Sequence, residues 1–295
     1  MKKFVILIPI YNDWKSLLKL IEQIDLEISE WNSNVSIFII NDASTEKMPL
    51  NELTLKNIKS IKVINMKNNQ GHARCYAAGL KFLTEKEDFD YVILMDGDGE
   101  DRPNELNLLF QKIKENPSKT VTANRIKRSE GMIFKIMYEF HKILTYVFTG
   151  KLIKFGNYGC LPKESAVKLV QQASIWSSYS GTLTKVIDNR VSIPSFRGAR
   201  YFGPSQMNFF NLLIHSFSII AVFKGSVIFR SILFIFFYLF FVFNNLTFIT
   251  LIPILLIVIF LFTILKISSR ESIHQLNNSL KNIRSIDNLS DSNSR

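Results

Sequence analysis

Short apolar runs rich in β-branched residues alternate with amphipathic helical patterns along the first part of the chain. The strand-like runs are residues 4–8, 35–40, 61–64 and 91–95. Hydrophobic side chains recur between them at a spacing of three to four residues, as in Trp14, Leu17 and Ile21, which is typical of helices. The alternation of strand and helix predicts the α/β fold class, with a mostly parallel sheet flanked by crossover helices.

The fourth strand-like run ends in a cluster of acids. These acids are Asp96, Asp98, Glu100 and Asp101. Ligands of open α/β sheets bind at the carboxyl ends of strands, and carboxylate oxygens suit Mg²⁺ or Mn²⁺ carrying a diphosphate. Two intervening glycines allow Asp96, Asp98 and Glu100 to converge on one ion. A solvated acidic turn is the alternative, whereas an EF-hand is excluded because its sixth position would be Asp101 instead of Gly.

Polar residues also follow the other three predicted strands, at 9–13, 41–44 and 68–74. Asp13 and Asp42 can accept hydrogen bonds from a base or ribose. Gly71 permits close approach of a ligand to the backbone, and Arg74 can bind phosphate. Each residue alone is more typical of a turn or a helix cap. All four strand ends should nevertheless face one crevice, which favours a ligand site.

Two apolar stretches stand near the C-terminus. Residues 226–243 contain one charge, Arg230, and residues 246–265 contain none. Both approach or reach the roughly 20 residues needed to cross a bilayer. Asn244 and Asn245 separate them, which predicts a tight helical hairpin in the membrane; two buried core helices are the alternative.

Positive charges flank this hairpin only at its outer ends. They are Lys224, Arg230, Lys266 and Arg270. The positive-inside rule therefore predicts that both ends are cytoplasmic, in a multi-pass protein of the inner (plasma) membrane. The N-terminal apolar run is short and reads as a first strand, not as a signal peptide.

Two further segments, 132–148 and 207–223, have amphipathic helical patterns. Each is expected either to lie in the membrane interface or to pack as an ordinary helix against the sheet. Residues 155–160 are expected to form a loop. The polar residues 267–295 are expected to be disordered apart from a short helix.

The composition excludes several classes of function. The net charge of +11 is dispersed, and no helix-turn-helix or RNA-binding signature accompanies it, so nucleic acid is not an expected partner. Anionic lipid and phosphorylated ligands explain the charge better. Cys75 and Cys160 have no metal or redox spacing, which fits a reducing cytosol without zinc.

Four motifs give the chain a specific resemblance. They are IPIYN at 8–12, NDAS at 41–44, NQGHARCYAAG at 69–79 and MDGDGED at 95–101. In these motifs, residues 4–205 resemble the inverting family-2 glycosyltransferases of GT-A fold, whose sheet is Rossmann-like and mostly parallel. Three later features, NRIKRSE at 124–130, RGARYFG at 197–203 and the hairpin, are similar to the polyprenyl-phosphate glycosyltransferases of the dolichol-phosphate mannose synthase type.

The resemblance implies a UDP- or GDP-sugar donor, a polyprenyl phosphate acceptor and a divalent cation, Mg²⁺ or Mn²⁺. It implies donor binding by Pro9, Tyr11, Asp13, Asp42, Ser44, Gly71, Arg74 and Asp96. It implies catalytic roles for Asp98, Arg125 and Arg128, and contacts with the acceptor phosphate for Arg128, Arg197 and Arg200. It implies metal binding by Asp96, Asp98 and Glu100.

The chain departs from the family pattern at three places. Asp13 replaces the usual Glu, Asp-Gly-Asp-Gly-Glu replaces Asp-Ala-Asp-Leu-Gln, and Gly203-Pro-Ser205-Gln206 lacks the Lys of the usual Gly-x-Ser-Lys. The extra acid, Glu100, is expected to tighten metal binding.

The protonation state of the attacking oxygen distinguishes a hydroxyl acceptor from a phosphate acceptor. A sugar hydroxyl must lose a proton, so its transferases normally provide a carboxylate as general base. Residues 173–181, where a base would be expected, contain no acid. A phosphate acceptor is already an anion and needs cationic clamping instead, which arginine supplies.

We therefore expect transfer of a sugar to a polyprenyl phosphate at the cytoplasmic face. Transfer to a glycan or glycolipid hydroxyl is the alternative within enzymes, and an inactive nucleotide-sugar-binding scaffold is the alternative outside them. The expected domains are a catalytic domain at 1–205, an interfacial helix at 206–225, the hairpin at 226–266 and a polar tail at 267–295. Homo-oligomerisation stays open.

Overall fold

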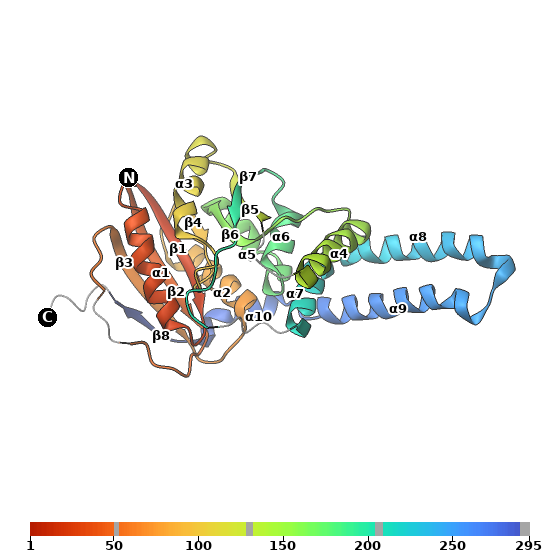
Figure 1. Ribbon diagram of the computed structural model, residues 1–295. Helices are drawn as coiled ribbons and strands as arrows, with labels where there is room; N and C mark the ends of the chain where they lie inside the picture. Colours follow the sequence, from red (N-terminus) through yellow and green to blue (C-terminus); the bar gives the residue numbers. More distant parts are fainter. Residues whose placement is uncertain (50–52, 128–131, 204–208, 290–295) are drawn as a thin grey trace.

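The structure is a computed structural model that describes residues 1–49, 53–127, 132–203 and 209–289. Within these residues an eight-stranded sheet has the order β7-β5-β6-β4-β1-β2-β3-β8 (Figure 1). The strands are β1 (Lys2–Ile10), β2 (Ser33–Asn41), β3 (Ile58–Met66), β4 (Tyr91–Leu94), β5 (Thr120–Lys127), β6 (Phe155–Pro162), β7 (Arg190–Phe196) and β8 (Ile283–Asn288). The helices are α1 (Trp14–Glu27), α2 (His72–Lys86), α3 (Leu106–Glu115), α4 (Met132–Thr149), α5 (Lys163–Val170), α6 (Tyr179–Val186), α7 (Phe209–Ala221), α8 (Lys224–Val242), α9 (Phe248–Ser268) and α10 (Ile273–Asn277).

The sheet is mixed and matches the predicted fold class. Strands β1, β2, β3 and β4 pair in parallel, as do β5 and β7. Strand β6 runs antiparallel between β4 and β5. The parallel strands place their carboxyl ends at one edge, where the polar strand-end residues follow.

The core has two layers, one on each face of the sheet. Alternate side chains of β1 point to opposite faces, so Ile6 packs with α1 and α3 while Leu7 packs with α2, α5 and α6. Because both faces are covered by helices, the central strands read as continuous apolar runs in the sequence.

Two expectations for irregular segments are wrong. Residues 155–160 form most of β6, where Gly159 lets the strand lie close to β5; a Cβ there would stand 2.6 Å from the Val121 carbonyl oxygen. The tail was expected to be disordered apart from a short helix; α10 is such a helix, but residues 283–288 form β8, which pairs antiparallel with β3. Its polar composition suits an edge strand that is mostly exposed.

Helices α8 and α9 form the predicted pair of long apolar helices and project together from the body of the protein (Figure 1). Both are long and apolar enough to cross a membrane, and most of their side chains are exposed. The Tyr238 hydroxyl donates to the Thr250 carbonyl, 3.0 Å away, and joins the two helices.

Helix α4 confirms the helical pattern predicted at 132–148, and it lies at the base of the hairpin. Its Leu144 and Phe148 pack against a small cluster that includes Ile220, Val227 and Ile264 from α7, α8 and α9. Among the described residues, α4 packs mainly against α7 and α8.

Candidate functional site

The turn that follows β4 is held by hydrogen bonds among its own acids. The Asp101 carboxylate accepts from the Asp96 backbone N–H at 2.9 Å, and the Asp98 carboxylate accepts from the Glu100 N–H at 3.0 Å. Gly99 has a φ of 87°, a conformation that glycine adopts without strain. The turn thus places four acids, Asp96, Asp98, Glu100 and Asp101, at the carboxyl edge of the sheet.

Asp96 has two partners on the first turns of α2, which the sequence did not identify as site residues. The His72 Nε2 lies 2.9 Å from Asp96 Oδ1, and the Tyr76 hydroxyl donates to the same oxygen at 2.7 Å. His72 and Tyr76 are four residues apart and therefore share one face of the helix. That spacing lies within the motif at 69–79, so the signal was present in the sequence.

Burial and mutual repulsion set the charge of this cluster. Burial, followed by the negative charge of Asp96, raises the pKa of Asp98 to about 6 and that of Asp101 to about 8. Burial also opposes ionisation of Asp96, but the charge and hydrogen bond of His72 outweigh it and lower the pKa of Asp96. Of Asp96, Asp98 and Asp101, Asp96 therefore ionises most readily.

The arginines after β7 bind these carboxylates directly. Arg200 Nη1 donates to Asp98 Oδ2 at 2.7 Å, and its Nη2 donates to Asp13 Oδ2 at 2.8 Å. The Arg200 Nε is buried without a hydrogen-bond partner. Arg197 forms an ion pair with Glu100. The predicted phosphate-binding arginines and the predicted metal ligands therefore meet in one site.

Backbone contacts dock the loop that carries these arginines onto the acidic turn. The Gly198 N–H donates to the Glu100 carbonyl at 2.8 Å, and the Tyr201 N–H donates to the Asp98 carbonyl at 3.0 Å. The Tyr201 ring lies against Gly99, where a Cβ would stand 2.5 Å from the ring. A side chain at position 99 would therefore push the loop away from the turn.

Of the other predicted catalytic arginines, Arg125 lies beside the acidic turn, with Nη2 3.9 Å from Asp101 Oδ1. Arg128 lies outside the described residues. Arg125 is mostly buried, and its charge helps to lower the pKa of Asp96. Its position is consistent with a cation that faces the acids from the β5 side.

The predicted donor-binding residues fall into two groups. Tyr11, Asp13 and Ser44 follow β1 and β2, where Ser44 Oγ accepts from the Asn12 N–H at 2.9 Å; Pro9 is buried inside β1. Asp42 is buried, and its two oxygens accept from the Gln70 and Gly71 N–H groups at 2.7 and 2.8 Å. In this structure Asp42 therefore holds the start of α2 in place.

Arg74 stacks on Trp176, with its guanidinium carbon 5.3 Å from the ring centroid. Burial, followed by the positive charge of Arg270, lowers the pKa of Arg74. Trp176 in turn donates to Gln275 of α10 at 2.7 Å. Through Trp176, Arg74 is thus connected to α10, which follows α9 in the chain.

Residues 173–181, where a general base would be expected, lie mostly in the protein core. Ser174, Trp176 and Tyr179 are buried, and Tyr179 lies behind Tyr76 with ring centroids 6.5 Å apart. The segment contains no acid, as the sequence shows.

A divalent ion fits two of the three predicted ligands. Among the described residues, no group of three or more His, Cys, Asp or Glu side chains is placed to hold an ion, and Glu100, the third predicted ligand, pairs with Arg197. Asp96 and Asp98 are hard oxygen donors at one strand end, and their mutual repulsion calls for positive charge there. Arg200 supplies that charge in this structure.

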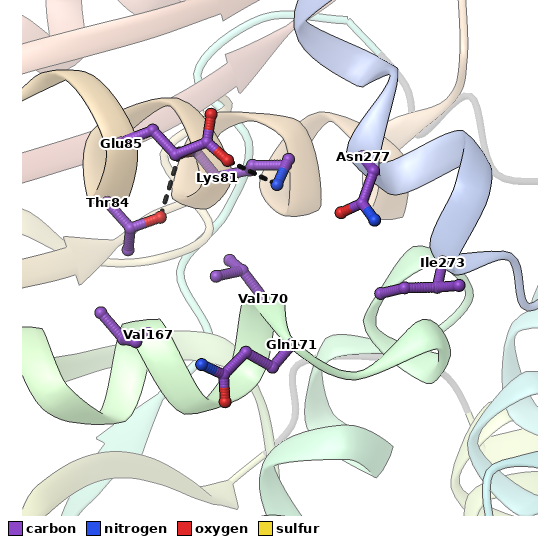
Figure 2. Close-up of a pocket in the computed structure, with 8 residues that line it drawn as sticks. All are labelled: Lys81, Thr84, Glu85, Val167, Val170, Gln171, Ile273 and Asn277. Carbon is purple, nitrogen blue, oxygen red and sulfur yellow. Dashed lines mark hydrogen bonds and ion pairs between the residues drawn. The ribbon is translucent and has the colours of Figure 1, made fainter.

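Two cavities of the described residues contain none of the predicted site residues. One of about 420 Å³ lies between α2, α5 and α10, and Figure 2 shows Lys81 and Glu85 on its wall opposite Val170. The Lys81–Glu85 ion pair spans 2.6 Å. The second, about 240 Å³, lies near the ends of β2, β3 and β8 and is lined in part by Trp14, Asn65 and Asp287.

The sequence and the structure have known relatives. The family model described as glycosyl transferase family 2 matches residues 5–169. Undecaprenyl-phosphate 4-deoxy-4-formamido-L-arabinose transferases from two strains of Klebsiella pneumoniae are 25% identical over 219 residues, which is 72% of this chain and 64% of theirs. The chain thus spans less than two thirds of the length of these relatives.

The fold is similar to that of glucosyl-3-phosphoglycerate synthase from Mycobacterium tuberculosis. A crystal structure of that enzyme with Mn²⁺, UDP-glucose and phosphoglyceric acid has a TM-score of 0.56 at 12% identity, covering 77% of this chain and 80% of the enzyme. A second structure, with Mn²⁺ and UDP-glucose, has a TM-score of 0.55 at 12% identity and covers 77% and 79%.

Proposed function

Because this chain belongs to glycosyl transferase family 2, we propose that it moves a sugar from a nucleoside diphosphate to a polyprenyl phosphate at a membrane surface. The curated relatives are named for transfer to undecaprenyl phosphate, and the structural neighbours bind UDP-glucose. Both names support the proposal for this chain.

The donor is proposed to bind at the carboxyl edge of the sheet. Tyr11, Asp13 and Ser44 would face its nucleoside, and Asp96 and Asp98 would hold an ion on its diphosphate. A divalent ion bound there would neutralise the charge that develops on the departing diphosphate. Mg²⁺ and Mn²⁺ both suit these oxygen ligands.

The arginines are proposed to serve the phosphates. Arg200 and Arg197 now neutralise Asp98, Asp13 and Glu100, and each guanidinium has the planar geometry that binds phosphate through two hydrogen bonds. When an ion occupies the carboxylates, these guanidinium groups become available to an anionic ligand. Arg125 would act from the β5 side, and the catalytic role of Arg128 stays a prediction from the sequence.

Transfer would need no protein base. An oxygen of the acceptor phosphate, already ionised, forms a bond to the anomeric carbon while the bond from that carbon to the donor diphosphate breaks. Attack from the face opposite the leaving group inverts the anomeric centre. Residues 173–181, where the sequence led us to expect a base, contain no acid.

The hairpin is proposed to bring this site to the lipid. Helices α8 and α9 would cross the inner (plasma) membrane, with the catalytic domain and both ends cytoplasmic, as the flanking Lys224, Arg230, Lys266 and Arg270 indicate. Helices α4 and α7 at the hairpin base would then lie near the membrane interface. We also propose that residues 1–205 form the catalytic domain, to whose sheet β8 adds an edge strand.

One observation carries the proposal: Arg200 bridges Asp98 and Asp13, so the charges needed for a diphosphate and for a phosphate are gathered in a single site. Membranes that contain the protein can be incubated with a panel of labelled nucleotide sugars and polyprenyl phosphate. Transfer of label into the lipid fraction is the expected result. A protein that binds nucleotide sugar without any turnover would instead be a scaffold.

A further inference from the structure

We propose that strand β8 positions the donor-binding loops through Asn65, so that the segment following the membrane hairpin completes the donor half of the site. The proposal rests on the proposed function, because it concerns the same donor loops. Asn65 and β8 would act as positioning elements and would not touch the donor.

Asn65 of β3 is the junction between β8 and the rest of the sheet. Its Nδ2 donates to Ser285 Oγ at 2.9 Å and to Asp287 Oδ2 at 2.6 Å. Its Oδ1 accepts from Asn41 Nδ2 at 2.8 Å. The two β8 acceptors therefore fix the orientation of the Asn65 amide, with its oxygen toward β2.

The chain of hydrogen bonds continues from Asn41 into the donor loops. Asn41 Oδ1 accepts from the Ser44 N–H at 3.0 Å, and Ser44 Oγ accepts from the Asn12 N–H at 2.9 Å. Asn12 Oδ1 in turn accepts from the Thr45 N–H at 2.8 Å. A continuous path thus joins β8 to the loops that follow β1 and β2.

These loops have backbone conformations that need such support. Asn12 has a φ of 52° and Ala43 a φ of 57°, both in the left-handed region that residues other than glycine rarely adopt. Such conformations persist where surrounding contacts hold them, and they gather at functional sites. The hydrogen bond from the Ser44 N–H to Asn41 Oδ1 spans Ala43, and the Asn12 N–H itself donates to Ser44 Oγ.

Strand β8 contributes little to the hydrophobic core. Its side chains are exposed except for that of Ile283, which is partly buried against the α2 side of the core. Ile286 is 45% exposed. Loss of the β8 side chains should therefore disturb the loops more than the fold.

The cavity of about 240 Å³ supports the same reading. Asn41, Asn65 and Asp287 line it together with Glu46 of the loop after β2. The β8 carboxylate and the donor loop thus face one space.

The test uses the full chain in detergent and the double variant Ser285→Ala with Asp287→Ala, which removes both acceptors of Asn65. Binding of UDP and of GDP, each with Mn²⁺, would be measured by calorimetry. We expect about tenfold weaker binding of the nucleotide that the wild type prefers, the effect of losing one or two hydrogen bonds. The donor KM should rise in parallel while kcat at saturating donor stays within about twofold.

Arg284→Ala is the matched control, because Arg284 alternates with Ser285 and contacts the Lys67 carbonyl instead of Asn65. It should bind nucleotide as the wild type does. The single variant Asp287→Asn keeps an acceptor oxygen for Asn65 and should retain most of the wild-type nucleotide affinity. Equal nucleotide affinity of the wild type and the folded double variant would overturn the inference alone. A wild type that binds neither nucleotide would overturn the proposed function and this inference with it.

Discussion

Arg200 binds Asp98 through Nη1 at 2.7 Å, so a residue expected to bind phosphate is paired with a residue expected to bind metal. Its second nitrogen binds Asp13 at 2.8 Å and links the acidic turn to the loop after β1. A divalent ion and an anionic donor that arrive together would each replace one half of this pair. Without ligands, Arg200 and the two carboxylates therefore neutralise one another, and each is in place for a ligand of the opposite charge.

Replacing Asp98 by Asn should abolish turnover. The amide keeps the size of the side chain but removes a charged ligand from the proposed ion. EDTA should have the same effect on the wild type, and added Mg²⁺ or Mn²⁺ should reverse it. The control is Asp88→Asn, an exposed acid that precedes β4 and so lies at the opposite end of that strand from the acidic turn. Full activity of Asp98→Asn, or of the wild type in EDTA, would rule out the metal role.

Replacing Arg200 by Lys should lower kcat/KM by at least about tenfold with the fold preserved. The ammonium group keeps the charge but cannot bind two partners in one plane, as the guanidinium does. Steady-state kinetics checks this, with circular dichroism as the measure of folding. Arg284→Lys on β8 is the control and should leave the rate unchanged. Wild-type kinetics for Arg200→Lys would remove this residue from the site.

Replacing Gly99 by Ala should inactivate the enzyme by displacing the loop at 197–203. Alanine is strained at a φ of 87°, and its Cβ would meet the Tyr201 ring. Gly225→Ala is the matched control, since a Cβ at Gly225 has open space around it. Activity of both variants would be compared at equal amounts of folded protein. An active Gly99→Ala enzyme would show that the loop position is not required.

Binding of Mn²⁺ should weaken as the pH falls below about 6. Burial and the charge of Asp96 raise the pKa of Asp98 to about 6, so protons compete with the ion below that pH and not above it. For one proton the affinity should drop about tenfold per pH unit. Titration of Mn²⁺ without donor or acceptor isolates this effect. An affinity that is constant from pH 7 to pH 5 would contradict it.

The hairpin should cross the membrane with its turn outside. A cysteine introduced as Asn245→Cys should react with an impermeant maleimide added to intact cells. Cys75 and Cys160 are buried, and burial raises the pKa of both thiols, so they should stay unlabelled in the folded protein. Labelling of a tag placed after Arg295 from outside intact cells would overturn the topology.

The sequence predicted the central strands, the crossover helices and the apolar helix pair, because each has a strong local pattern. It did not predict β8, since the pairing of residues 283–288 with β3 depends on contacts more than 200 positions apart. Strand β6 was hidden by glycines, which have low strand propensity and are used here for close approach to β5.

For the site, the positions of polar residues at strand ends predicted which side chains lie near one another, but not which of them form hydrogen bonds or ion pairs together. Asp96 and Asp98 are two residues apart, yet one binds His72 and Tyr76 while the other binds Arg200. Asp42 was expected to bind the donor, and the sequence did not show that its two oxygens also accept from the N–H groups at the start of α2. Such choices depend on side-chain geometry that spacing in the sequence does not determine.

The most direct test of the central claim is the chemistry of the product formed from a labelled nucleotide sugar and a polyprenyl phosphate. We predict a lipid-linked glycosyl phosphate that releases its sugar in mild acid, formed by the wild type and not by Asp98→Asn. A product that survives mild acid, formed on a hydroxyl and lost on changing Glu164 or Asp188 to its amide, would contradict the account.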